Sequence, residues 1–288
     1  MRSLLFVPAD GGAKLDKAMA SGADAVILDL EDSIMPERKP QARAAALEFL
    51  KAAQSRTQRP RLLVRVNGLD TGMTDADLDA VVAGKPDAIL FPKAEGGATV
   101  THLDAKLTAR EAIAGLPEAS IKILAQTVES AVGLFAAGSY RNSSARLIGM
   151  TWGPEDLSAE LGAEANREAD GTLTEPYRLA RSFCLFGAAA AKVPAIETIH
   201  VNFRDPEVLR RDTELARRDG FSGRLAIHPA QVAVINEVFT PSPEQIAKAK
   251  AVVAAFAAQP SAGAVGIDGR MYDRPHLARA QALLARIG

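Results

Sequence analysis

The sequence has few of the residues that would place it in several broad classes of protein. It contains one cysteine among 288 residues, which excludes an intrachain disulfide and gives no sign of secretion. Lysine plus arginine number 34 and aspartate plus glutamate 35, and no basic stripe occurs. Because binding to nucleic acid or to an anionic membrane depends on such a stripe, we expect neither as a partner.

Long apolar runs are also missing. The N-terminal run Ser3–Val7 is too short for a signal peptide, and the longest later stretch is interrupted by Lys192 and Pro194. We therefore expect no membrane span and a cytoplasmic location. No GxGxxG or GxxxxGK[ST] phosphate loop occurs, and the four histidines lack the spacing of a zinc site. Cys184 lies in an apolar helical stretch, which favours a small core residue over a nucleophile.

The chain does show a repeated alternation of short apolar runs with longer segments of helical period. The runs are mostly uninterrupted, which is typical of parallel strands covered on both faces. They are Ser3–Val7, Ala25–Leu30, Leu62–Val66, Ala88–Phe91, Ile121–Gln126, Arg146–Met150, Ala195–Val201 and Arg224–Ile227. Strands that alternate with helices form a parallel sheet, so we predict an α/β fold, a (β/α)₈ TIM barrel over residues 1–240.

A C-terminal extension, residues 241–288, departs from this pattern. The segment Ser242–Gln245 has the arrangement of an N-cap serine, a proline in the first turn and a capping-box glutamine. The helix that it starts is predicted to run through Phe256. A Gly/Ala/Ser-rich loop, Pro260–Gly269, and a last helix at about Pro275–Ile287 follow. We expect this loop-plus-helix extension to act as a lid or as a subunit-contact arm.

Polar side chains follow the predicted strands at the end where the catalytic groups of such a barrel lie. Arg65 is in the third strand, Lys93 follows the fourth, and Glu129 and Asp156 follow the fifth and sixth. Because these last two strands are neighbours, both carboxylates can reach one metal ion. Two carboxylates with open positions for water suit Mg²⁺. Charges gathered at this end of the barrel, its mouth, are costly unless a cation and an anionic substrate compensate them.

Simpler interpretations compete for several of these residues. Ser33, Ser130 and Glu155 are better explained as helix caps or solvated loop residues. Glu31 and Asp32 are either groups that orient the site or loop carboxylates.

The polar strand ends belong to short segments that run in order along almost the whole chain. The segments are Leu5–Pro8, Leu28–Ser33, Arg65–Gly68, Pro92–Glu95, Gln126–Ser130, Gly153–Leu157, Ala226–Pro229 and Gly269–Asp273. Taken together, they resemble the citrate lyase β-subunit-like acyl-CoA lyases, which include malyl-CoA and citramalyl-CoA lyases, within the HpcH/HpaI aldolase group. The set is specific for the family and much less specific for the substrate.

This resemblance implies a TIM barrel with Mg²⁺ held by Glu129 and Asp156. It implies that Arg65 binds the substrate's carboxylate or the developing enolate oxygen, with Glu129 and Pro154 as further candidate substrate contacts.

The resemblance also concerns the extension. In the relatives, a C-terminal arm reaches over a neighbouring subunit and donates an aspartate, which matches Asp273 here. That implies a homo-oligomer, a trimer or a hexamer. Asp273 joins Arg65, Glu31 and Asp32 as a candidate catalytic residue, with a helix cap near Pro275 as the simpler alternative for Asp273.

The expected function is Mg²⁺-dependent cleavage of a carbon–carbon bond in a 3-hydroxy acyl-CoA such as citramalyl-CoA or malyl-CoA. The expected products are acetyl-CoA and a 2-oxo acid, and the reaction is expected to be reversible. One alternative is an acyl-CoA thioesterase on the same fold. Another is a citrate lyase β subunit that acts on an acyl-carrier-protein thioester. A non-enzymatic binding module requires that the mouth residues fail to converge.

Two further chemistries are disfavoured. Free 2-oxo-acid aldolases that resemble this chain use an early histidine, and none precedes His102 here. Lys93 is interpreted as an ion-pair partner rather than a Schiff-base nucleophile, because the metal makes a second electrophile superfluous. The acyl group is expected to depend on the pocket around Met150, Trp152 and the loop Gly162–Glu175, where no signature is found.

Overall fold

The computed structural model describes residues 1–285 and divides into two compact units, Met1–Phe239 and a second that begins at Thr240. Parallel strands form the sheet of the first unit. They are β1 (Ser3–Pro8), β2 (Ala25–Asp29), β3 (Arg61–Arg65), β4 (Ala88–Ala94), β5 (Lys122–Thr127), β6 (Leu147–Trp152), β7 (Ile196–Glu197) and β8 (Gly223–Ala226). Their order is β6-β5-β4-β3-β2-β1-β8-β7. Consecutive strands are therefore neighbours, as a right-handed βα succession produces.

The two outer strands of this order approach each other and nearly close the sheet. Met150 of β6 forms an isolated parallel bridge with Ala195, directly before β7. The backbone N–H of Met150 donates to the carbonyl of Pro194 at 3.0 Å. The eight parallel strands thus make a nearly closed barrel, which confirms the predicted fold class.

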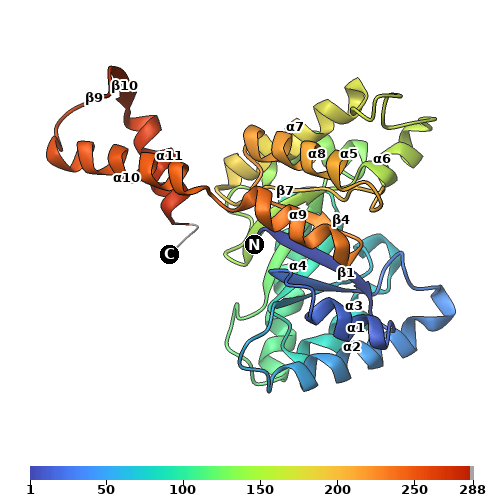
Figure 1. The fold of residues 1–288 in the computed structure, drawn as a ribbon. Coiled ribbons are helices and arrows are strands. Elements are labelled where there is room, and N and C mark those ends of the chain that lie inside the picture. Colours follow the sequence, from blue (N-terminus) through green and yellow to red (C-terminus); the bar gives the residue numbers. More distant parts are fainter. Residues whose placement is uncertain (286–288) are drawn as a thin grey trace. The chain divides into compact units, whose positions relative to one another are not determined.

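Helices connect the strands on the outside of the barrel (Figure 1). The α-helices of this unit are α1 (Ala13–Met19), α2 (Lys39–Ala53), α3 (Thr74–Val81), α4 (Gly97–Ile113), α5 (Ala131–Phe135), α6 (Pro154–Leu161), α7 (Glu175–Ala191), α8 (Pro206–Asp219) and α9 (Pro229–Phe239). Short 3₁₀ turns are η1 (Pro36–Arg38), η2 (Leu69–Thr71), η3 (Val82–Gly84) and η4 (Ala137–Tyr140). Among the residues that the structure describes, no helix is both long and apolar enough to cross a membrane.

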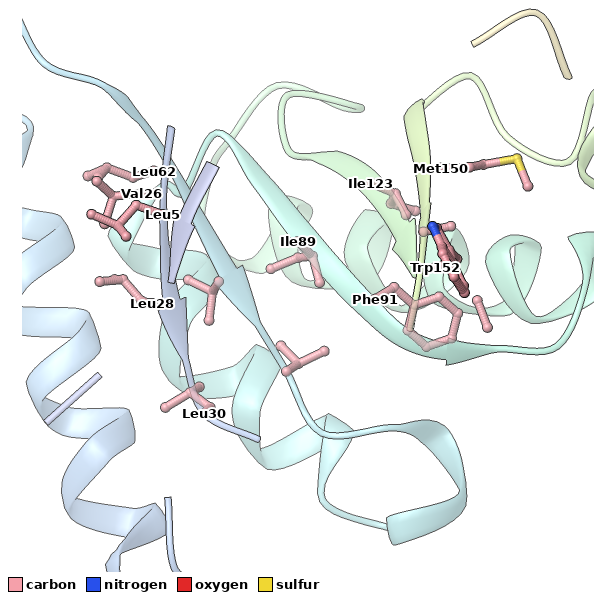
Figure 2. Packing of buried hydrophobic residues seen from close by; sticks show 14 of the residues in the cluster. Leu5, Val26, Leu28, Leu30, Leu62, Ile89, Phe91, Ile123, Met150 and Trp152 are labelled. Carbon is pink, nitrogen blue, oxygen red and sulfur yellow. The ribbon is translucent and has the colours of Figure 1, made fainter. Parts of the chain in front are cut away.

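Alternate residues of each strand serve two different cores. Leu4, Ile27 and Leu90 belong to the smaller cluster, which fills the barrel interior, whereas Leu5 and Val26 face outward to the helices. The outward residues of adjacent strands pair directly, as Leu5 does with Val26 (Figure 2). Burial on both faces explains why the strands are uninterrupted apolar runs in the sequence.

Strand β7 is much shorter than the predicted run Ala195–Val201. Only Ile196 and Glu197 pair with β8. The next amide, of Thr198, donates to the side chain of its neighbour Glu197 at 2.9 Å instead of to a strand carbonyl. The buried carboxylate therefore ends the ladder, a local competition that hydrophobic patterning does not reveal.

The second unit contains α10 (Pro243–Ala258), β9 (Ala264–Ile267), β10 (Arg270–Asp273) and α11 (Arg274–Leu284) around a small apolar core of its own. The predicted capping box is confirmed, since Ser242 and Gln245 exchange both hydrogen bonds. The prediction of a plain loop over Pro260–Gly269 was wrong, because β9 and β10 form an antiparallel hairpin there. The predicted end of the last helix at Ile287 lies outside the described residues.

Candidate functional site

A cavity of about 410 Å³ lies at the carboxyl ends of the barrel strands. Its walls include five residues singled out in the sequence: Asp32, Arg65, Glu129, Pro154 and Asp156. They come from segments that follow β2, β5 and β6 and from the end of β3, so they converge because the parallel strands all end at one rim. Glu31 also lies at this rim and contacts Arg65.

Arg65 is held by carboxylates from the loop that follows β2. Its Nε and Nη2 donate to the two oxygens of Asp29, each at 2.7 Å. Its Nη1 lies 2.8 Å from Glu31 Oε2 and 3.5 Å from Asp32. Burial opposes the charge, but these carboxylates outweigh it and hold the pKa of Arg65 above its ordinary value. A bidentate clamp fixes the guanidinium plane, so Arg65 is a rigid, permanently charged wall of the cavity.

Glu31 and Asp32 differ sharply in their surroundings. Glu31 is buried and bridges Arg65 to Lys93, whose Nζ donates to Glu31 Oε1 at 2.6 Å. Burial raises the pKa of Glu31 to about 7, although Arg65 and Lys93 oppose the rise. The Asp32 side chain is 59% exposed and reaches only the edge of Arg65. Glu31 thus joins the two cations of the cavity mouth, whereas Asp32 is a largely exposed carboxylate at the cavity rim.

Glu129 is a buried acidic residue of the cavity wall. Its Oε2 accepts the backbone N–H of Lys93 at 2.6 Å, and its Oε1 accepts the side-chain amide of Gln126. Burial raises the pKa of Glu129 well above its ordinary value, and the charges of Asp156 and Glu31 add to the rise. Asp156 is 36% exposed and lies 3.5 Å from Lys93 Nζ. Glu129 and Asp156 therefore share one strongly acidic region.

The backbone around Glu129 is tightly constrained. Val128, which precedes it, and Lys93, which donates to it, both have positive φ angles, 53° and 49°. Such angles are unfavourable for side chains of this kind and cluster at functional sites. A Cβ on Gly153 would lie 2.7 Å from Glu129 Oε1, so only glycine leaves room for the carboxylate. The fold thus holds the position of Glu129 at the expense of local strain.

Sequence reasoning missed partners that complete this site. Asp29 was part of a recognised segment, but its clamp on Arg65 was not predicted. A signal existed, because both residues end adjacent strands and are register neighbours. Gln126, which contacts Glu129, carried no comparable signal. Lys93 is the ion-pair partner that was predicted, which confirms that interpretation.

Other sequence expectations fall elsewhere. Ser130 is the N-cap of α5, as predicted, and Cys184 is buried in the core. Met150 does not line the cavity: it packs in the outer core against α7, where Gly187 admits it. The expectation that Met150 shapes the acyl pocket was therefore wrong, whereas Trp152 does line the cavity.

Asp273 lies in the second unit, at the start of α11. It caps this helix: its side chain accepts from the backbone N–H of His276, and the backbone N–H of Asp273 donates to the Nδ1 atom of His276. The hydrogen bond from His276 lowers the pKa of Asp273. The simpler interpretation of Asp273 as a helix cap is thus present in the structure, with the carboxylate ionised at neutral pH.

Comparison with known proteins agrees with this architecture. The model of the HpcH/HpaI aldolase/citrate lyase family matches residues 2–229. This chain belongs to that family. It is 33% identical to the citrate lyase subunit beta of Leuconostoc mesenteroides subsp. cremoris, over 98% of this chain and 92% of the relative. It is 35% identical to a (3S)-malyl-CoA thioesterase of Cereibacter sphaeroides, over 99% of this chain and 94% of the relative.

Solved structures give the same answer. The CitE protein of Mycobacterium tuberculosis, crystallised with magnesium, acetoacetate and coenzyme A, superposes with a TM-score of 0.76 at 34% identity. That match covers 99% of this chain and 97% of CitE. A structure of the citrate lyase beta subunit of M. tuberculosis, complexed with oxaloacetate and magnesium, matches at 33% identity with a TM-score of 0.68, over 83% of this chain and 96% of that chain. This family member is therefore an enzyme of the citrate lyase β-like aldolase group with a TIM-barrel fold.

Proposed function

We propose that this enzyme is a Mg²⁺-dependent lyase that splits a 3-hydroxy acyl-CoA, such as citramalyl-CoA or malyl-CoA, into acetyl-CoA and a 2-oxo acid. One observation carries the proposal: Glu129, Asp156 and Arg65 line the same cavity at the carboxyl ends of the strands. Acidic oxygen ligands beside a fixed guanidinium fit a substrate with a carboxylate and a hydroxyl group. The relatives crystallised with magnesium support the choice of metal.

The residues present fit a hard divalent cation. Glu129 is buried with the negative charge of Asp156 beside it, an arrangement that a cation relieves. Within residues 1–285, no group of three or more metal-binding side chains is found. Mg²⁺ needs no more than one or two carboxylates, because it keeps waters and takes substrate oxygens. Gln126 Oε1 is buried without a partner among the described residues and adds an oxygen dipole there.

The proposed roles follow from these positions. Mg²⁺, when bound by Glu129 and Asp156, supplies Lewis-acid stabilisation of negative oxygen. Arg65 binds the carboxylate or the enolate oxygen with its fixed N–H fork. Pro154 forms part of the cavity wall against the substrate.

The proton of the substrate hydroxyl is assigned to Asp273. In the proposed assembly, a homotrimer or hexamer, the second unit of one subunit brings Asp273 to the cavity of another. The carbon–carbon bond then breaks, the 2-oxo acid forms from the hydroxyl carbon, and the enolate of the thioester takes up a proton to give acetyl-CoA. An ionised carboxylate on a separate unit suits this task, since it can accept the hydroxyl proton and carry it out of the cavity when the unit moves away. We place this chemistry in the cytoplasm.

Two relatives support alternatives to the lyase reaction. The malyl-CoA thioesterase at 35% identity favours hydrolysis of the thioester on the same scaffold. The citrate lyase β subunit at 33% identity favours a partner subunit and a thioester carried by an acyl-carrier protein.

The deciding experiment incubates the purified enzyme and Mg²⁺ with citramalyl-CoA and malyl-CoA, and separately with acetyl-CoA plus pyruvate or glyoxylate. Products are identified by mass. We expect cleavage or condensation that EDTA abolishes and that is lost in Glu129→Ala and Asp273→Asn. Free CoA with an intact hydroxy acid would replace the lyase with the thioesterase. If no free thioester reacts, the remaining hypothesis is a citrate lyase β subunit that acts on an acyl-carrier-protein thioester.

A further inference from the structure

We propose that this protein has a second binding site, for a small organic anion that carries a phosphate or carboxylate group, in a pocket between α7 and α8. The pocket has a volume of about 380 Å³ and lies on the outer side of β7 and β8. That volume is within the range of small-molecule sites, roughly 300–1,000 Å³. The proposal does not depend on the reaction at the barrel mouth.

The pocket wall carries an excess of positive charge. Its arginines are Arg167, Arg178, Arg181, Arg218 and Arg224, whereas only three carboxylates line it. Leu173 and Leu215 supply an apolar part of the wall. Arginine is suited to oxoanions because its donors form a planar fork.

Arg224 is the buried centre of this arrangement. It is 2% exposed, on β8, and its closest carboxylate oxygen in the described chain is Asp212 Oδ2, at 3.9 Å. Its Nη1 donates to Thr213 Oγ1 at 3.2 Å, and its Nε has no partner among the described residues. A buried charge with such weak pairing is costly, and a bound anion removes the cost. Burial lowers the pKa of Arg224, the reverse of the effect that close carboxylates have on Arg65.

The carboxylates in the wall are already engaged by other groups. Glu197 accepts from Trp152 Nε1 and from Arg181 Nε, each at 2.6 Å. Asp212 lies 3.2 Å from Arg167 and 3.3 Å from His200, closer than it lies to Arg224. Both carboxylates are therefore bound more closely to other groups than to Arg224.

Asp219 is occupied in the same way, by Arg181 at 2.8 Å and Arg218 at 3.0 Å. Arg178 and Arg218 are 53% and 68% exposed. Arg178 pairs with Glu175 at 2.6 Å, but both guanidinium groups remain exposed. They can meet an anion that enters from solvent, while Arg224 binds it from inside. One oxoanion with several acceptor oxygens matches these separate donors.

This second pocket shares a wall with the catalytic cavity, the cavity of about 410 Å³ at the carboxyl ends of the strands. Trp152 and Thr198 line both cavities, and Glu197 holds the indole N–H and the Thr198 backbone N–H together. Trp152 is the only tryptophan of the chain. Its fluorescence therefore reports on occupancy of either cavity without any label, and the variants below separate the two.

The test titrates the full-length protein with inorganic phosphate, succinate and, as a neutral control, glycerol, at constant ionic strength. Binding is followed by tryptophan fluorescence and by calorimetry. We expect saturable binding of phosphate or succinate and none of glycerol. The anion whose binding saturates shows whether the pocket recognises a phosphate or a carboxylate group. Arg224→Met should weaken binding about tenfold or more, since a charge-assisted hydrogen bond is lost.

Two controls locate the site. Arg210→Gln removes the same charge from α8 outside the pocket, where Arg210 pairs with Glu237, and should leave the affinity unchanged. Arg65→Gln should also leave it unchanged, whereas loss of binding in Arg65→Gln alone would assign the anion to the catalytic cavity and overturn the proposal. Failure of both anions to saturate would overturn it too.

A second variant guards against misfolding. If Arg224→Met does not fold, the double variant Arg178→Gln/Arg218→Gln changes only exposed side chains. It should weaken binding severalfold, and an unchanged affinity would overturn the proposal.

Discussion

Two buried arginines, at opposite ends of the same barrel, have different surroundings. Arg146, at the amino end of β6, donates through all three nitrogens, to Asp104, Glu111, Thr108 and the carbonyl of Ile121. It forms no part of the catalytic cavity. The carboxylates that it binds have pKa values below their ordinary range, with burial outweighed by these hydrogen bonds.

At the mouth the balance is reversed. Arg65 and Lys93 face five carboxylates, namely Asp29, Glu31, Asp32, Glu129 and Asp156. Burial raises the pKa of both Glu31 and Glu129. The same kinds of residue thus make a self-sufficient network at one end and a network that lacks positive charge at the other. The first stabilises the fold, and the second is suited to bind a cation.

The largest effect should come from Glu129→Gln, which removes a proposed metal ligand. We expect turnover to fall roughly 10³-fold, because several kcal/mol of charge stabilisation is lost. The rise in Tm on addition of Mg²⁺ should disappear with it. Glu111→Gln is the matched control, a buried glutamate in the Arg146 network, and should retain turnover and the response to Mg²⁺. Equal losses in both variants would refute the distinction between the two ends.

The next effect concerns stability. Arg146→Met leaves Glu111 buried without its charged partner, and we expect a loss of about 3 kcal/mol in the free energy of unfolding. Turnover per folded molecule should stay normal, because Arg146 is remote from the cavity. Urea unfolding at neutral pH, combined with kinetics on the folded fraction, measures both quantities. A stability equal to that of the unaltered enzyme would show that the network is dispensable.

The sequence predicts the barrel well because its signal is local. Each strand is a run of apolar residues, and burial on both faces requires that composition over a few positions. Details that depend on a polar side chain are less accessible: β7 ends where Glu197 captures the amide of Thr198. The hairpin of the second unit was missed although Asp268-Gly269, both with positive φ, is a strong signal for a two-residue hairpin turn.

The site was predictable only in part for a related reason. Arg65, Glu129 and Asp156 stand at strand ends, and the fold places strand ends together. The bridge from Glu31 to Lys93 joins residues 62 positions apart, and its existence depends on side-chain reach across the mouth. Composition and periodicity contain no information about such pairing.

A smaller effect is expected at the glycine beside the proposed metal ligand. Gly153→Ala places a Cβ 2.7 Å from Glu129 Oε1, so the carboxylate must move. We expect the affinity for Mg²⁺ to fall about 10-fold to 100-fold, as when groups that orient a ligand are altered. Calorimetric titration with Mg²⁺ measures this. Gly138→Ala is the control, since a Cβ there meets nothing within 4 Å. Equal affinities in the two variants would show that the site accommodates the added methyl group without moving Glu129.

The smallest effect is the acid response of the Arg146 network. The pKa values of Asp104 and Glu111 are lowered in the folded protein, so their stabilisation is complete above their unfolded values of 3.8 and 4.5. It is lost as the pH falls through the lower, folded values, because protonation then favours the unfolded chain. Arg146→Met removes the largest cause that lowers the pKa of Glu111 and, beside the hydrogen bond from Ser144, one cause that lowers the pKa of Asp104. The slope of unfolding free energy against pH below about 4.5 should therefore be shallower in this variant, by at most the two protons that these carboxylates bind. Denaturant unfolding from pH 6 to 3 measures the slopes, and parallel slopes would place the acid sensitivity in another part of the molecule.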